Sequence, residues 1–370
     1  MKVKYWLSIL PVEICGIVRD KFSFYFRDEL LDLVQKELGE ATFLISAANY
    51  KGFRKRQYRK KSEKILADSG GFQFYFLTPG KKRKLMEVRE DMFAFQMRIG
   101  DYILGGDVPS GKEMDEVQFR EYVRLTQSNM ELQFRLGGSD LGGKFINVLH
   151  GVSPRSMEIW YNAVKDFPHI GWALGAKGAG ASGPIFQLLY LLEKGEIKEG
   201  SFIHFFALTG RRTLWQVLWV LKELGLLDKV VVSTDSSSFS LGRFGSLFYK
   251  EDIVRYEEIR QGREVVLYDG TVLRDVPKRL DNELSFKLTL TSVYWFIQFF
   301  RNVLEDFRSK QNEVMKAVRK DSVDVLVKWF KFGGVDTAWY KVKEKVSGRS
   351  RVRLLDRYQV EKGGYSGRRV

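Results

Sequence analysis

The sequence predicts an α/β protein built on a parallel sheet, and among such folds it favours a TIM-type (β/α)8 barrel. Short apolar, β-like segments alternate with stretches of helical periodicity along most of the chain. About seven such strands can be counted, close to the eight of a closed barrel. Polar and glycine residues also stand where these strands end. Strand ends of a TIM barrel form one rim, so this placement favours the barrel over a doubly wound sheet, which the alternation alone leaves open.

The expected strands are short apolar runs that end in small, polar or glycine residues. Between most of them, apolar residues recur at helical spacing, and Ser153-Pro154 adds an N-cap followed by a proline at the first helical position. This alternation indicates successive βαβ units. The expected strands are residues 42–46, 64–67, 102–106, 145–149, 170–174, 202–207 and 229–233, and the expected helices are residues 113–136, 153–167, 184–194 and 211–226.

The pattern changes beyond Asp235. Residues 251–274 are charged, with a hairpin expected around Asp269-Gly270, and residues 284–332 are rich in aromatics at helical spacing. From Lys341 the chain is basic and short of long apolar runs, which predicts a tail that orders on meeting a partner. We therefore expect a barrel over residues 1–280, with insertions, and a helical, basic C-terminal extension over residues 281–370 that packs on the barrel or completes it.

The composition points to a polyanionic partner. The 370 residues include 61 Lys and Arg against 46 Asp and Glu, a formal net charge of +15. Nucleic acid is favoured over membrane, and a basic solvated surface without a partner is the alternative. Cys15 is the only cysteine, which excludes an internal disulfide and a multi-cysteine metal site. No signal peptide or membrane-spanning stretch is evident, so we expect a cytoplasmic protein without a membrane partner, cofactor or metal.

The polar residues at the strand ends are the candidate site. Asp68 begins the run Asp68-Ser69-Gly70-Gly71-Phe72, whose glycines permit positive φ and close approach of a flat ligand that Phe72 could stack on. An aspartate after a strand is also a common helix N-cap, and this alternative stays open for Asp107 and Asp235. The strand-end residues are Asp68, Asp107, His150-Gly151, Gly175, Thr209-Gly210 and Asp235.

The string Ile65-Leu66-Ala67-Asp68-Ser69-Gly70-Gly71-Phe72-Gln73 resembles the signature of the tRNA-guanine transglycosylase superfamily. The resemblance continues in order through residues 106–109, 148–152, 173–176, 206–210 and 234–236, and covers roughly residues 40 to 245. His150 stands where that family usually has glutamine, and Ala176 replaces the second of two glycines. His150 can also be read as a structural histidine, as can His169 and His204.

The resemblance implies a role for each strand-end residue. Asp235 corresponds to the nucleophile that attacks C1′ and forms a covalent aspartyl-glycosyl intermediate, and Asp68 to the general acid and base. Asp107 corresponds to the acceptor for the N–H edge of a guanine-like base. The implied base-binding residues are Ser69, Gly70, Gly71, Phe72, Asp107, His150, Gly151, Gly175 and Ala176.

The missing cysteines select a branch of that superfamily. Its tRNA branch holds a structural zinc with three cysteines and a histidine, and this chain has no cysteine beyond Cys15. A second branch, known from phages and bacterial genomic islands, exchanges guanine in DNA for a 7-deazaguanine base. The resemblance thus implies DNA and the free 7-deazaguanine base as partners, in the host cytoplasm if the protein is phage-encoded. A homodimer and accessory DNA-modification proteins stay open.

Three other interpretations remain open at this point: a zinc-less tRNA-guanine transglycosylase, a catalytically inactive nucleic-acid-binding barrel subunit, and an enzyme of small phosphorylated metabolites. The last leaves two basic runs beside the Asp68 segment unexplained, where phosphates could pass, although a solvated basic loop is an alternative. A duplex would have to flip out its guanine. The residues expected to contact nucleic acid are Lys51, Arg54, Lys55, Arg56, Arg59, Lys60, Lys61, Lys81, Lys82, Arg83, Lys84 and Arg243.

Overall fold

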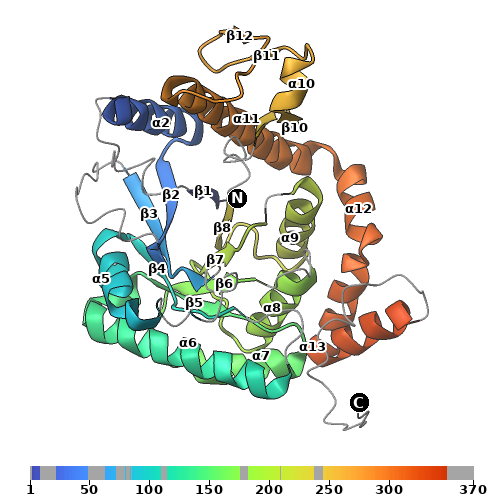
Figure 1. The fold of residues 1–370 in the computed structure, drawn as a ribbon. Coiled ribbons are helices and arrows are strands. Elements are labelled where there is room, and N and C mark those ends of the chain that lie inside the picture. The colour runs from blue at the N-terminus through green and yellow to red at the C-terminus, as the bar shows by residue number, and fades with distance from the viewer. Residues whose placement is uncertain are drawn as a thin grey trace, which may run out of the picture.

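Eight parallel strands form the centre of the molecule in the computed structural model, which describes residues 2–8, 22–48, 63–71, 80, 84, 86–109, 115–175, 182–208, 210–236 and 245–347. Each strand is hydrogen-bonded to the next in chain order, and β1 pairs with β8 as well as with β2 (Figure 1). The predicted α/β class is therefore confirmed, with a TIM-like arrangement. The strands are β1 (Lys2–Ser8), β2 (Ala41–Ser46), β3 (Glu63–Asp68), β4 (Tyr102–Leu104), β5 (Phe145–Leu149), β6 (Gly171–Leu174), β7 (Phe202–Phe205) and β8 (Val231–Ser236).

Seven of these strands lie where the sequence predicts them. Every residue of β2 and β5 is buried, because side chains fill one face of a barrel sheet and helices cover the other. The eighth, β1, has a mixed sequence in which lysines alternate with apolar residues, and it was not among the expected strands. Its place is set by pairing along β8, from Lys2 opposite Val231 to Leu7 opposite Ser236.

Helices surround the sheet (Figure 1). Four of them match the predicted ones to within a few residues, whereas α2 and α5 were not expected. Ser153 caps α7 by accepting the Ser156 N–H, and Pro154 is the first helical residue, as predicted. The helices that follow strands are α2 (Phe22–Leu38), α5 (Arg89–Ile99), α6 (Glu116–Gly137), α7 (Pro154–Val164), α8 (Ser182–Glu193), α9 (Arg211–Glu223) and α11 (Asn282–Ser309).

A small β-rich unit separates β8 from α11. Its second hairpin turns at Asp269-Gly270, as predicted, with Gly270 at φ +86°. Leu247, Val254 and Val265 are buried in a hydrophobic cluster of its own, which also includes Leu288 of α11. The elements are β9 (Ser246–Tyr249), β10 (Asp252–Arg255), α10 (Tyr256–Arg260), β11 (Val265–Val266) and β12 (Val272–Leu273).

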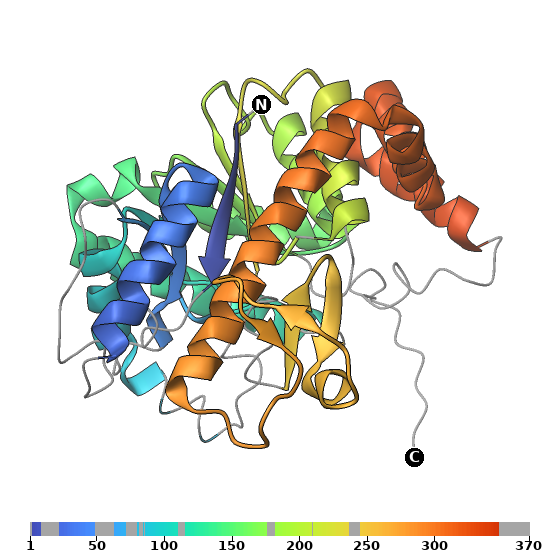
Figure 2. The ribbon, with the colours of Figure 1, turned by 90° about the horizontal axis from the view of Figure 1, so that it is seen from above.

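Three C-terminal helices complete the described structure. Helix α11 lies against α2 and α9, so it occupies the position of the helix after β8 (Figures 1 and 2). Helix α12 (Gln311–Lys320) packs on α9, and α13 (Val323–Ser347) packs on α8 with a break at Gly333–Gly334. One hydrophobic core runs from the strands through Phe296 of α11 to Trp339 of α13. None of the helices in the described part of the chain is long and apolar enough to cross a membrane.

Candidate active site

Residues from several strand ends meet on one rim of the barrel. Asp68 is the last residue of β3, Asp107 is the third residue after β4, and His150 directly follows β5. Hydrogen bonds connect the loop after β3 to Asp107, and Asp107 to His150. The structure therefore brings these predicted site residues together, although they lie far apart in the sequence.

The Asp107 carboxylate is held on both of its oxygens. The Ser69 hydroxyl donates to Oδ1 over 2.8 Å, and Nε2 of His150 lies 2.8 Å from Oδ2. The imidazole packs edge-on against Trp160, with ring centroids 4.7 Å apart. Asp107 and His150 are each only 7% exposed, so the pair is shielded from water. In this arrangement both oxygens of the Asp107 carboxylate already have protein partners.

The surroundings of His150 fix how many protons the pair holds. Its Nδ1 lies 3.1 Å from the carbonyl oxygen of Gly175. Because a carbonyl oxygen only accepts, Nδ1 must carry a proton. The short contact between Nε2 and Asp107 needs a further proton, carried by the ring or by the carboxyl group. In either case the pair as a whole is uncharged.

Asp68 is a buried carboxyl group with a shifted titration. Burial raises the pKa of Asp68 to about 7, and the negative charges of Asp107 and Asp235 add to this, while a hydrogen bond from the Gly70 N–H opposes it. Burial is the largest cause, so the direction holds even though the Asp107–His150 pair is uncharged overall. Near neutral pH, Asp68 can both give and take a proton, as a general acid and base must.

Asp235 lies at the same end of the barrel in a different environment. It is the penultimate residue of β8, and its side chain is 14% exposed. Oδ1 accepts the backbone N–H of Ala207 over 2.9 Å, and Nε2 of His204 lies 3.3 Å from the same oxygen. Asp235 thus lies on the rim with only a small part of its side chain exposed. His204, which the sequence pattern left among the structural histidines, contacts it.

A network of buried amides from α5 and α6 supports the β4 end. Gln133 accepts the Gly106 N–H over 2.7 Å and donates to Gln96 over 2.6 Å and to the Leu104 carbonyl over 3.1 Å. Gln96 in turn bridges the carbonyls of Ala67 and Leu104, which belong to neighbouring strands. Sequence reasoning missed both glutamines. Their only signal is a polar residue on the apolar face of a predicted or possible helix.

The carbonyl groups after β5 and β6 already have protein partners. Nε2 of Gln187, on α8, donates to the carbonyl oxygens of Gly151 and Gly175 over 2.8 and 3.1 Å. Gly151 has φ +105°, and a Cβ there would lie 2.8 Å from the backbone nitrogen of Met157. Glycine is therefore required at residue 151 by the local packing.

The space beside Asp107 is small. The described residues that line it enclose about 20 Å³, which has room for a water molecule but not for a purine. Gly71 closes it on one side, because a Cβ there would lie 2.5 Å from the Asp107 carbonyl oxygen. The lining residues are Ser69, Gly70, Gly71, Met86, Arg89, Met92, Phe93, Gly106, Asp107, Val108 and Asn129.

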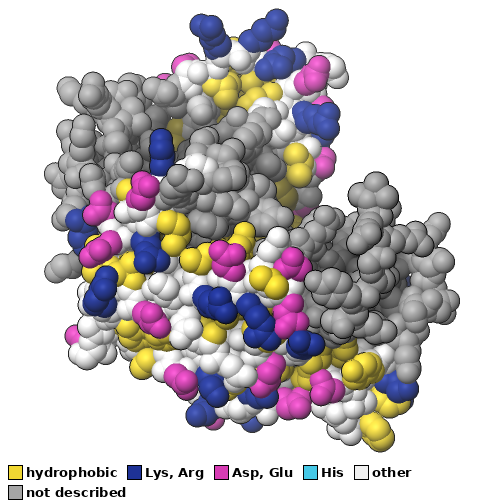
Figure 3. Space-filling model, turned by 60° about the horizontal axis from the view of Figure 1, so that its bottom comes forward, with side chains coloured by type: hydrophobic (Ala, Val, Ile, Leu, Met, Phe, Trp, Pro, Cys, Tyr) yellow, Lys and Arg dark blue, Asp and Glu magenta, His cyan; other side chains and the backbone are white. Residues whose placement is uncertain are grey.

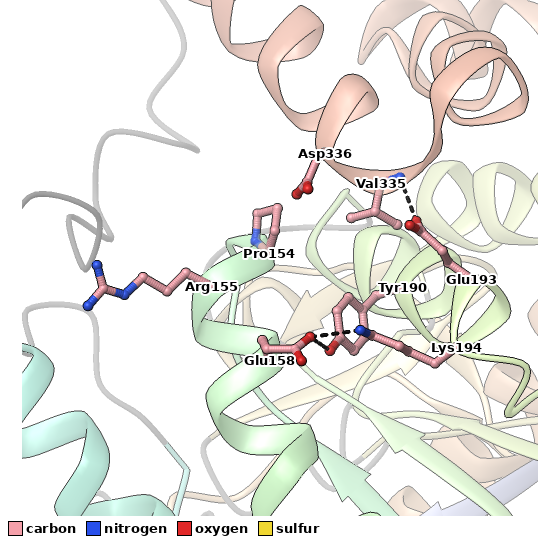
Figure 4. A pocket seen from close by; sticks show the side chains of 8 residues that line it. All are labelled: Pro154, Arg155, Glu158, Tyr190, Glu193, Lys194, Val335 and Asp336. Atoms are coloured by element: carbon pink, nitrogen blue, oxygen red, sulfur yellow. Dashed lines mark hydrogen bonds and ion pairs between the residues drawn. The ribbon is translucent and has the colours of Figure 1, made fainter.

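A larger cleft, of about 250 Å³, lies between α7, α8 and α13, and none of the predicted site residues lines it (Figure 4). Glu158 accepts a hydrogen bond from the Tyr190 hydroxyl and pairs with Lys194 over 2.9 Å, which lowers the pKa of Glu158. Glu193 accepts the Val335 N–H over 2.7 Å at the break in α13. Glu158 and Lys194 pair with each other, and Glu193 accepts a backbone N–H of α13. We therefore interpret the cleft as a junction between packed helices.

Most residues expected to contact nucleic acid lie outside the described residues, as do Phe72 and Ala176. Only Lys84 of that set is described, and it is exposed. The described part of the chain carries about as many acidic as basic side chains, and the two are mixed over the face in Figure 3. The basic excess of the sequence thus falls in the remaining segments, which include residues 51–61 and the C-terminal tail.

Among the described residues, no group of three or more His, Cys, Asp or Glu side chains is placed to hold a metal ion. No family model matches the chain, and no curated protein matches it. The resemblance to guanine transglycosylases therefore remains a hypothesis, to be judged on the chemistry of the site.

Proposed function

We propose that the protein exchanges guanine in DNA for a 7-deazaguanine base through a covalent intermediate on Asp235. The proposal depends on one observation, which is that the two carboxyl groups of the rim have different environments. Burial raises the pKa of Asp68 to about 7, whereas Asp235 has 14% of its side chain exposed and its Oδ1 lies 3.3 Å from Nε2 of His204. Two carboxyl groups whose environments differ in this way suit a double displacement at a sugar carbon, with one as acid and base and the other as nucleophile.

The proposed chemistry uses each group twice. The Asp235 carboxylate attacks C1′ while the bond from C1′ to the guanine nitrogen breaks, and the departing base takes the proton of Asp68. The incoming base then returns a proton to Asp68 as its ring nitrogen attacks C1′. The bond between Asp235 and C1′ breaks in that step, which regenerates the carboxylate and leaves the new base on the sugar.

Base recognition is proposed at Asp107. Each oxygen of the carboxylate has a second lone pair beyond those used by Ser69 and His150, so the group can still accept from an N–H edge. The 20 Å³ beside it is too small for the base. The turn at Ser69–Gly71 would therefore have to move away from Asp107 on binding.

Charge and cysteine content support DNA as the substrate. The net charge of +15 suits a polyanion, and the runs at residues 51–61 and 81–84 follow β2 and β3, whose carboxyl ends lie on the rim. The three-cysteine zinc site of the tRNA branch is excluded by the single cysteine, Cys15. The target guanine would be flipped out of a duplex, or taken from a single strand, before Asp235 reaches C1′.

The test is incorporation of a radiolabelled 7-deazaguanine base into DNA or tRNA. We expect label in DNA, none with Asp235→Asn, and normal incorporation with Asp228→Asn, an exposed control in the turn before β8. A covalent protein–DNA complex should be trapped with the wild-type chain and not with Asp235→Asn. Label in tRNA only would overturn the DNA assignment. Absence of label and of trapped complex with both nucleic acids would favour an inactive binding subunit.

A further inference from the structure

We propose that His204 and the backbone N–H of Ala207 form a holder that fixes Oδ1 of Asp235 and leaves Oδ2 as the attacking atom. His204 is then a positioning residue, which acts through Asp235 and does not touch the substrate. This inference deepens the proposed function and rests on it for its kinetic consequence. Its geometric content stands on contacts between β7 and β8.

The histidine lies between two side chains of β8. His204 is fully buried, and the strand register places it opposite Ser233. Its Nδ1 is 2.8 Å from the Ser233 hydroxyl, and its Nε2 is 3.3 Å from Oδ1 of Asp235. Ser233 and Asp235 share a face because side chains alternate along a strand. Ser233, His204 and Asp235 thus form a continuous row.

The groups next to the two ring nitrogens of His204 favour one tautomer. Its Nε2 is buried and has no hydrogen-bond partner within the described residues, and the nearby group is a carboxylate, which only accepts when ionised. A proton on Nε2 would point toward Asp235, whereas a lone pair there would face its negative charge. The Ser233 hydroxyl can donate to Nδ1, which places the ring proton on Nε2. The 3.3 Å contact between Nε2 and Oδ1 is then attractive.

The second part of the holder is a strained turn. Ala207 has φ +51°, a conformation uncommon for residues other than glycine, and its N–H donates to Oδ1 over 2.9 Å. The Thr234 hydroxyl lies 2.9 Å from the Phe205 carbonyl and 2.8 Å from the Leu208 carbonyl, and its single hydrogen can be donated to either, which connects this turn to β8. The strain is located where the N–H must face Asp235.

Both contacts fall on the same oxygen. Within the described residues no hydrogen bond reaches Oδ2 of Asp235, and the side chain is partly exposed. A carboxylate fixed through one oxygen presents the other in a defined direction, which lowers the entropic part of the barrier to attack.

The first experiment reads the histidine directly. The chain has three histidines, so each ¹⁵N-labelled ring can be assigned from its loss in a His→Gln variant. We expect His204 to be the Nε2–H tautomer at neutral pH, and its signals to shift in Asp235→Asn but not in Asp68→Asn. An Nδ1–H tautomer, or no response to Asp235→Asn, would overturn the inference. This readout does not require catalysis.

The second experiment compares variants of the holder in the exchange assay. His204→Leu removes the donor at similar volume, and should lower kcat by on the order of 10²-fold with KM unchanged. His204→Gln keeps a donor near the position of Nε2 and should recover part of that loss. If His204→Leu does not fold, Ser233→Ala is the substitute, because it removes the group that sets the tautomer and should lower kcat about 10-fold. Equal kcat in all of these variants would overturn the inference.

The two experiments separate the inference from the proposed function. The expected His204 signals together with no exchange on either nucleic acid would refute the transglycosylase and leave the holder standing. Exchange activity together with an unresponsive His204 would do the opposite.

Discussion

Nε2 of His150 lies 2.8 Å from Oδ2 of Asp107, and the two side chains form a buried pair that joins the end of β5 to the loop after β4. The carbonyl of Gly175 fixes a proton on the other ring nitrogen, so the pair is uncharged as a unit. Glutamine at position 150 would hold Asp107 with a neutral amide. The imidazole of His150 can itself exchange a proton with the carboxyl group, which makes the pair a testable feature of the site.

The pair predicts an asymmetric response to substitution. His150→Leu leaves the Asp107 carboxyl group buried without its imidazole partner, and should lower the free energy of unfolding by about 3 kcal/mol. Asp107→Asn should cost less than about 1 kcal/mol, because the introduced amide can donate to a neutral His150 while its oxygen accepts from Ser69. Adding Asp107→Asn to His150→Leu should therefore restore stability in urea titrations.

The control for this cycle is Glu116→Gln, which weakens partly exposed pairs with Arg120 and Arg155. It should change stability by less than about 1 kcal/mol. Strict additivity of the two substitutions at the buried pair would show that His150 and Asp107 do not share a proton in the folded protein.

Asp68 predicts a pH dependence of stability. Its pKa is about 7 in the folded protein against an ordinary value of 3.8, so the folded state binds the proton more tightly than the unfolded chain. The unfolded state therefore loses this proton first as pH rises, and the folded state loses stability between about pH 4 and pH 7. Asp68→Asn should remove this loss and be more stable than wild type at pH 8, by at most about 4 kcal/mol.

Urea titrations at pH 4 and pH 8 provide the measurement, with Asp228→Asn as the exposed control. The difference between Asp68→Asn and wild type should be small at pH 4 and large at pH 8. A difference that does not change with pH would mean that Asp68 titrates normally in the folded protein.

The amide network predicts a large effect on stability from a buried residue outside the predicted site. Gln133→Leu leaves the Gly106 N–H and the Leu104 carbonyl without this partner at a fully buried position, which should cost about 3 kcal/mol. Gln118→Leu, at an exposed position of the same helix, is the matched control and should cost less than about 1 kcal/mol. Similar midpoints for the two variants in urea titrations would refute the supporting role of Gln133.

Gly171 predicts a strict steric limit at the start of β6. A Cβ there would lie 1.8 Å from the carbonyl oxygen of Phe202 on β7, a backbone atom that cannot move without breaking the strand pairing. Gly171→Ala should cost about 3 kcal/mol or more, whereas at Gly143 a Cβ would meet nothing within 4 Å and alanine should be tolerated. Thermal unfolding of both variants checks this, and equal melting temperatures would contradict it.

Local patterns in the sequence were sufficient for most of the architecture. Apolar runs predicted seven of the eight barrel strands, and helical spacing predicted α6 to α9, because both depend on the periodicity of neighbouring residues. The cap at Ser153 and the hairpin at Gly270 were visible for the same reason. Strand β1 was not predicted, because its mixed composition has no clear strand pattern. Its strand conformation depends on pairing with β2 and β8.

The sequence by itself also determined which residues stand at strand ends, and so named Asp68, Asp107, His150 and Asp235 as candidates. Only the tertiary structure decided how they act on one another. The protonation of Asp68 depends on burial and on charges from other strands, and the partners of Asp107 lie 38 and 43 residues away in the chain. The contact of His204 with Asp235 depends on the β7–β8 register. Such contacts cannot be recognised from neighbouring residues, because they form only when segments that are distant in the sequence pack together.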